Sequence, residues 1–232
     1  MKHFSEFEGK IGVSFADKNL LKQAFTHRSF LNEHPGEDIQ HNERLEFLGD
    51  AVLELVSTEY LYATFPNKPE GELTAYRAAL VNTVSISSVA KTLEMDNYLL
   101  LSKGEARDVG KARQFILANT YEAFIGALYL DQGYEAARTF ITTTLLYRLK
   151  TILEERSWQD AKSHFQEEAQ EKTGVTPSYS VLKEEGPDHA KIFTVGVYLG
   201  DEEVAVGQGQ SKQEAEQGAA AEALKRKGWG QQ

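Results

Sequence analysis

The sequence predicts an all-α domain followed by a small α+β domain with the order α-β-β-β-α. Apolar residues recur at intervals of three and four up to about residue 150, which is the spacing of helices that bury one face. Beyond about residue 160, apolar and polar residues alternate as they do in strands. We therefore expect a helical domain at residues 3–150, a linker at 151–159 and the α+β domain at 160–229.

Helical periodicity in the first domain is clearest in residues 20–25, in the stretch after Asp50 and in residues 73–93. Residues 116–130 are almost entirely apolar and predict the central helix of a bundle. Gly133 suits the end of that helix, because glycine is favoured at helix C-termini. A further helix is expected from residue 134 to about residue 155.

The second domain begins with a helix that we expect at residues 161–172 and that ends at Gly174. Strands are expected at residues 179–183, 191–198 and 203–207. Gly200 and Asp201 supply the turn between the last two strands. Ser211 is placed to cap a closing helix at 212–227, whose alanine-rich face would pack on the sheet.

The composition excludes several classes of protein. The chain has no cysteine, so it has no disulfides, thiolate chemistry or cysteine zinc site. Its apolar share of 41% is ordinary for a globular protein. We find no apolar run long enough to cross a membrane and no signal peptide at the N-terminus. We therefore expect a cytoplasmic protein without a membrane partner.

The formal net charge of −10 at first argues against a polyanionic partner. Residues 1–150 contain 16 basic and 20 acidic residues, and residues 151–232 contain 9 and 15, so neither half is basic. Binding of a polyanion would therefore depend on local clusters of Lys and Arg, and on metal ions that offset the carboxylates.

Three carboxylates form a stripe on one predicted helix. Glu43, Glu46 and Asp50 stand at i, i+3 and i+7, which places them within roughly 60° of arc on one side. Leu45, Leu48 and Val52 lie on the opposite side and are expected to face a core. Like charges this close repel one another. The stripe therefore either faces open water or holds hard cations, which take oxygen ligands.

A second helix carries two further candidate ligands. Asn119 and Glu122 are the metal-capable side chains of residues 116–130, and Gly126 is small enough for another helix to approach closely. A buried glutamate needs a partner. The economical arrangement packs the two helices so that Glu46, Asp50, Asn119 and Glu122 converge on Mg²⁺. The other interpretation is a single hydrogen-bonded glutamate in a core helix.

These residues occur in motifs that resemble those of bacterial ribonuclease III. The block from Asn42 to Asp50, with the letters NERLEFLGD, resembles the signature of that family. Further matches follow the family's order, at residues 26–29, 70–74, 103–105 and 122–131. The second domain resembles a double-stranded RNA-binding domain in its loop at 186–191 and its last helix at 211–217.

The resemblance implies a homodimeric endonuclease that cuts both strands of double-stranded RNA. It would depend on Mg²⁺, for which Mn²⁺ can substitute. It would use two metal ions, leave 5′-phosphates and 3′-hydroxyls, process rRNA and mRNA precursors, and need no small-molecule cofactor. The implied catalytic residues are Asp50, Glu122 and Glu43. The implied metal ligands are Glu46, Asp50, Asn119 and Glu122. Phe47 would plug a socket on the partner subunit, although its spacing equally fits a core aromatic residue.

One position departs from the family pattern. The family usually has Asp where this chain has Asn119. An amide oxygen still coordinates a hard cation, but it is neutral, so we expect weaker Mg²⁺ binding and slower cleavage. The alternative function is therefore a double-stranded RNA-binding protein whose metal site is too weak to cut. A third hypothesis, a metal-free helical interaction module, leaves Glu122 unexplained.

The resemblance also implies how RNA is held. A protein that binds an RNA duplex should contact both the shallow minor groove and the phosphates across the major groove. The distance between these two sets of contacts should be constant. The implied RNA-binding residues are Gln166, Glu167, His189, Lys191, Ser211 and Lys212. Of these, Lys212 would meet phosphate at the N-terminus of a helix, where backbone N–H groups add to its charge.

Overall fold

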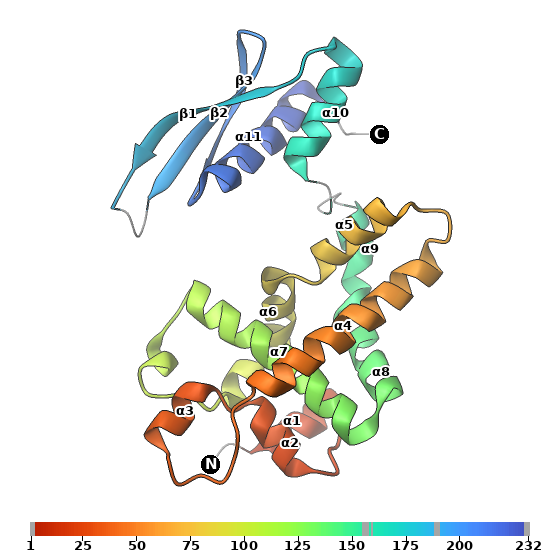
Figure 1. Cartoon of the computed structure of the whole chain (residues 1–232), viewed down its shortest axis with the longest axis vertical. Coiled ribbons are helices and arrows are strands. Elements are labelled where there is room, and N and C mark those ends of the chain that lie inside the picture. Colours follow the sequence, from red (N-terminus) through yellow and green to blue (C-terminus); the bar gives the residue numbers. More distant parts are fainter. Residues whose placement is uncertain (1–2, 155–157, 159, 188–190, 230–232) are drawn as a thin grey trace. The chain divides into compact units, whose positions relative to one another are not determined.

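The computed structural model describes residues 3–154, 158, 160–187 and 191–229. The chain divides into two compact units, Met1–Trp158 and Gln159–Gln232, and each is described here by itself (Figure 1). This division falls inside the linker expected at residues 151–159, and the expected domain limits stay a prediction. Among the described helices, none combines the length and apolar character that crossing a membrane requires.

The first unit is helical, as the sequence predicts. Its α-helices are α1 Phe4–Ile11, α2 Lys18–Ala24, α3 Arg28–Glu33, α4 Glu43–Thr64, α5 Glu70–Leu80, α6 Thr83–Thr92, α7 Lys111–Gln132, α8 Tyr134–Thr144 and α9 Leu149–Glu154. Short 3₁₀ turns are η1 Met95–Tyr98, η2 Glu105–Arg107 and η3 Leu146–Arg148. Within the described part of this unit, β pairing is limited to one isolated bridge between Thr26 and Leu100.

Helix α7 runs through the core of the first unit (Figure 1). Tyr121, Phe124 and Ile125 are fully buried, and the ring of Phe124 lies 5.6 Å from that of Phe7 in an edge-to-face contact. The helix ends at Gln132, and Gly133 follows with φ of 81°. The prediction of a central helix that stops at this glycine is therefore confirmed.

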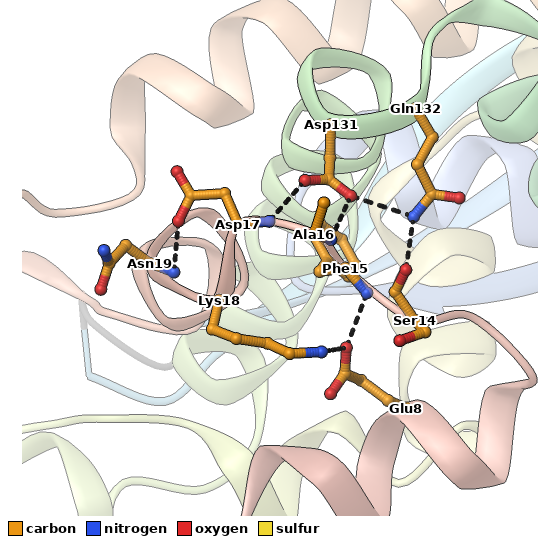
Figure 2. Close-up of polar contacts among 9 residues, drawn as sticks. All are labelled: Glu8, Ser14, Phe15, Ala16, Asp17, Lys18, Asn19, Asp131 and Gln132. Atoms are coloured by element: carbon orange, nitrogen blue, oxygen red, sulfur yellow. Dashed lines mark hydrogen bonds and ion pairs between the residues drawn. The ribbon is translucent and has the colours of Figure 1, made fainter.

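Hydrogen bonds attach the segment between α1 and α2 to the end of α7 (Figure 2). The Asp131 carboxylate accepts from the backbone N–H groups of Ala16 and Asp17 at 2.9 and 2.8 Å. The buried Glu8 carboxylate accepts from Nζ of Lys18 at 2.6 Å. The Asp131 contacts hold the segment before α2 against α7, whose middle carries the candidate site, and the Glu8–Lys18 contact joins α1 to α2.

One sequence prediction in this unit is wrong. Residues 134–155 do not form a single helix, because α8 ends at Thr144 and η3 separates it from α9. The Thr144 hydroxyl donates to the Phe140 carbonyl at 2.7 Å and also lies 2.7 Å from the Tyr121 hydroxyl. Such back-bonding by threonine bends helices, and Leu145 is left outside helical geometry with ψ of −52° and φ of −121°.

The second unit has the expected α-β-β-β-α order. It comprises α10 Ala161–Thr173, β1 Ser178–Glu185, β2 Ile192–Leu199, β3 Glu202–Gly209 and α11 Lys212–Lys227. The strands form an antiparallel sheet in the order β1-β2-β3. The side chains of Asp160 and Ser211 cap α10 and α11, because they accept from the backbone N–H groups of Ser163 and Glu214.

The helices of this unit pack on one face of the sheet (Figure 1). Phe165 of α10, Val197 of β2 and Ala219 of α11 are fully buried together. Gly207 lies where α11 meets β3, since a Cβ there would overlap the backbone of Ala219. The fold class predicted from the sequence is confirmed.

Candidate active site

The candidate site is built where α4 and α7 pack against each other. Gly49 of α4 and Gly126 of α7 face one another at this point. A Cβ on Gly49 would lie 2.8 Å from the Gly126 nitrogen and would overlap the Glu122 carbonyl. A Cβ on Gly126 would overlap the Leu45 carbonyl. The two glycines therefore allow a close helix crossing that brings the polar residues of both helices together.

The four expected metal ligands interact across this crossing. The Asn119 amide donates a hydrogen bond to the Glu46 carboxylate, and the charges of Glu46 and Asp50 act on Glu122. Glu46, Asn119 and Glu122 are half-buried, and Asp50 is exposed. The four side chains therefore lie near one another at the crossing. The catalytic and ligand roles of these residues stay predictions.

The carboxylates of the cluster repel one another. Burial, followed by the charges of Asp50 and Glu46, raises the pKa of Glu122 from 4.5 to about 7. Burial and the charge of Glu43 raise the pKa of Glu46, while the hydrogen bond from Asn119 opposes that change. Nearby positive charge therefore does not balance the negative charge at the centre of the cluster.

This chemistry fits a hard cation. Every candidate ligand offers an oxygen atom, and Mg²⁺ prefers oxygen ligands. A bound cation would also relieve the repulsion that helps to raise the pKa of Glu122. As the described residues stand, however, no three His, Asp or Glu side chains are grouped so as to hold a metal ion. The Glu46 carboxylate, which accepts a hydrogen bond from Asn119, would have to turn toward such a cation.

Glu43 lies beside the cluster and has a different partner. Its two carboxylate oxygens each lie 3.0 Å from a nitrogen of the Arg28 guanidinium, a two-point ion pair. His41 Nδ1 lies 3.8 Å from the same carboxylate. Arg28 thus engages Glu43 from the start of α3, and the charge of Glu43 also raises the pKa of Glu46.

Phe47 is not a core residue. Its side chain is 83% exposed, although it follows directly after the half-buried Glu46. It lines a hollow together with Leu20, Leu48 and Leu130. The core interpretation is therefore excluded, and the role of Phe47 at a dimer interface stays a prediction.

The second unit presents most of the expected RNA-binding residues at its surface. Gln166 and Glu167 are exposed on α10. The Ser211 side chain caps α11, and Lys212 is the first residue of that helix. His189 lies outside the described residues. The roles of these residues in RNA binding stay predictions.

Comparison with known proteins identifies the family. Residues 17–149 match the Ribonuclease-III-like family. Ribonuclease 3 of Enterococcus faecalis is 47% identical over 221 residues, which are 95% of this chain and 96% of that protein. The chain belongs to the ribonuclease III family. Ribonuclease 3 of Carboxydothermus hydrogenoformans is 48% identical over 214 residues, which are 92% of this chain and 91% of that protein.

Two further comparisons concern the separate units of this chain. The nuclease domain of ribonuclease III from Campylobacter jejuni is similar to it with a TM-score of 0.55 and 41% identity, covering 63% of this chain and 95% of that chain. Residues 161–227 match the double-stranded RNA binding motif. A ribonuclease III domain followed by this motif is the organisation of an endoribonuclease that acts on double-stranded RNA, so the resemblance seen in the sequence is confirmed.

Sequence reasoning did not single out two residues that contact the candidate site residues. Arg28 pairs with Glu43, and Glu184 contacts the ammonium groups of both Lys191 and Lys212. Arg28 belongs to a matched motif, so its charge and position were available as signals. Glu184 is one of many surface glutamates, and no pattern in the sequence distinguishes it.

Proposed function

We propose that this protein is a Mg²⁺-dependent endoribonuclease that hydrolyses both strands of double-stranded RNA as a homodimer. Its products would carry 5′-phosphates and 3′-hydroxyls, and its substrates would include rRNA and mRNA precursors in the cytoplasm. The observation that carries this proposal is the convergence of Glu46, Asp50, Asn119 and Glu122 at the crossing of α4 and α7. The double-stranded RNA binding motif supports the choice of substrate.

The four converging residues would hold the metal ions. When bound, Mg²⁺ or its substitute Mn²⁺ would supply activation of water and stabilisation of charge at the scissile phosphate. Because a neighbouring cation lowers the pKa of a carboxyl group, binding would release the proton that Glu122 retains up to about pH 7. Asn119 would turn its amide from Glu46 and offer its oxygen instead. No small-molecule cofactor is needed for this hydrolysis.

The dimer would place Phe47 against a partner subunit. Phe47 is 83% exposed and shares one hollow with Leu20, Leu48 and Leu130, and a contiguous apolar patch of this kind marks an interaction surface. The solved Campylobacter jejuni nuclease domain is described as having a region involved in dimer formation. Together these observations support a homodimer whose interface includes Phe47.

The test is cleavage and binding of a long labelled RNA duplex, measured side by side with Mg²⁺, with Mn²⁺ and with a chelator. Metal-dependent products that end in 5′-phosphates are expected. Glu122→Gln should bind the duplex without cutting it, while Glu135→Gln, a change at an exposed glutamate paired with Arg138, should cut normally.

Two other outcomes have defined meanings. Binding without cutting by the unaltered chain, with cleavage restored by Asn119→Asp, would establish the alternative of a weakened enzyme that serves as a double-stranded RNA-binding protein. The hydrogen bond between Asn119 and Glu46 is the observation in favour of that alternative. Absence of both binding and metal dependence would contradict the proposed function.

A further inference from the structure

A carboxylate lies between two lysines on the expected RNA-binding surface of the second unit. Oε1 of Glu184 lies 3.4 Å from Nζ of Lys212, and its Oε2 lies 4.0 Å from Nζ of Lys191. Glu184 belongs to β1, Lys191 immediately precedes β2, and Lys212 begins α11. One glutamate therefore contacts cationic groups from two other segments of the fold.

The position of Lys212 is further defined by an aromatic ring. Phe193 of β2 is the cross-strand partner of Glu184, and Nζ of Lys212 lies 5.7 Å from the centre of the Phe193 ring. An ammonium group is attracted to the face of such a ring. Lys212 is thus held at the N-terminus of α11, where backbone N–H groups and the helix dipole also favour an anion.

The contacts of Glu184 are weak enough to be exchanged. The exposed fractions are 59% for Lys212, 40% for Glu184 and 33% for Lys191, and water screens ion pairs of such exposure. An RNA phosphate can therefore replace the carboxylate as the partner of either lysine. The charge of Glu184 remains anchored to β1, where it repels a phosphate bound to the same lysines.

We infer that Glu184 competes with the RNA backbone for Lys191 and Lys212, and so limits the affinity of this protein for double-stranded RNA. The inference rests on the proposed function, in which these lysines meet RNA. Binding exchanges a lysine–carboxylate contact for a lysine–phosphate contact. Fewer counterions are then released than two unneutralised lysines would release.

The test compares two neutralising substitutions at neighbouring positions. Glu184→Gln removes the charge and keeps the size of the side chain. Glu185→Gln removes the same charge one residue along β1, where the side chain points to the opposite face and pairs with Lys183 at 2.7 Å. The comparison separates local competition from a general change of net charge.

Equilibrium binding of the full chain to an RNA duplex would be measured with a chelator present, so that the RNA is not cut, at several salt concentrations. Thermal unfolding would establish that each variant is folded. Glu184→Gln should bind roughly fivefold more tightly at low salt, with a salt slope steeper by up to about 1. Glu185→Gln should bind like the unaltered chain, and the gain from Glu184→Gln should shrink when it is combined with Lys212→Ala.

Three results would overturn the inference while the proposed function stands: equal tightening by both substitutions, no change with Glu184→Gln, or weaker binding with Glu184→Gln. The last result would mean that Glu184 orders the lysines for RNA. An unaltered chain that does not bind duplex RNA would overturn the proposed function and this inference with it.

Discussion

Gly49 and Gly126 oppose each other at the crossing of α4 and α7, and neither has room for a side chain. The crossing sets the separation of the two helices that carry the candidate ligands. A single added methyl group must therefore push the helices apart or distort their backbones. The candidate site depends on two residues that supply no functional group to it.

Alanine at either glycine should destabilise the first unit. We expect Gly49→Ala or Gly126→Ala to lower its free energy of unfolding by about 3 kcal/mol, because the Cβ would overlap backbone atoms that cannot move independently. Denaturant titration measures this loss. Gly9→Ala is the control, since Gly9 lies in α1 with open space around its Cβ, and it should be neutral or stabilising by up to about 1 kcal/mol.

Asn119→Asp should have opposite effects without and with metal. Without divalent cations it removes the hydrogen bond to Glu46 and adds a negative charge, so we expect the first unit to lose about 2 kcal/mol of stability. With Mg²⁺ it supplies an anionic ligand, so a lower Mg²⁺ concentration should suffice for stabilisation and for cleavage. Thermal unfolding across a Mg²⁺ titration tests both. An unchanged Mg²⁺ midpoint would count against Asn119 as a ligand.

The raised pKa of Glu122 predicts a pH dependence of stability. Between pH 4.5 and about 7 the folded chain retains a proton on Glu122 that the unfolded chain has lost. Stability therefore falls as pH rises through this window, by up to about 3 kcal/mol, and is constant above it. The Glu122→Gln variant has no titrating group at this position and should not lose this stability. Unfolding of the unaltered chain and of the variant, both without divalent cations, would measure the difference. A difference between them that is the same at pH 4.5 and pH 7 would refute the prediction, and Mg²⁺ should reduce the loss.

The candidate site was predictable in its main features because its determinants are local and periodic. The spacing of Glu46 and Asp50 places both on one side of a helix, and the apolar residues around Glu122 require a central helix. Small residues such as Gly126 then indicate where the two helices meet. These patterns depend on helical geometry alone, so they can be recognised in the sequence without the structure.

Other features depend on the path of the chain in three dimensions. The ion pair of Arg28 with Glu43 joins residues separated by an irregular segment. Helix α8 ends at Thr144, whose hydroxyl contacts Tyr121 of another helix. The exposure of Phe47 depends on which side of α4 is left uncovered. Neither propensity nor periodicity carries this information.

A charged residue at position 47 should weaken the proposed dimer. Phe47→Asp would place an unpaired charge in an apolar socket of the partner, which is costly. Light scattering coupled to size-exclusion chromatography over a dilution series should show a shift toward monomer. Val109→Asp is the control, because Val109 is 84% exposed in the loop before α7 and outside the hollow that Phe47 lines. An unchanged dimer with Phe47→Asp would place the interface elsewhere.

Removing the ammonium group of Lys212 should weaken RNA binding without regard to sequence. A lysine at the start of α11 that meets phosphate contributes through charge, and phosphates are the same in every duplex. We therefore expect Lys212→Ala to lower affinity similarly for duplexes of different sequence and to reduce the salt slope by about 1. Lys183→Ala, which removes a lysine paired with Glu185 on the same unit, should change affinity much less. A loss confined to certain duplex sequences would show that Lys212 contacts bases, because only base edges differ between duplexes of the same length.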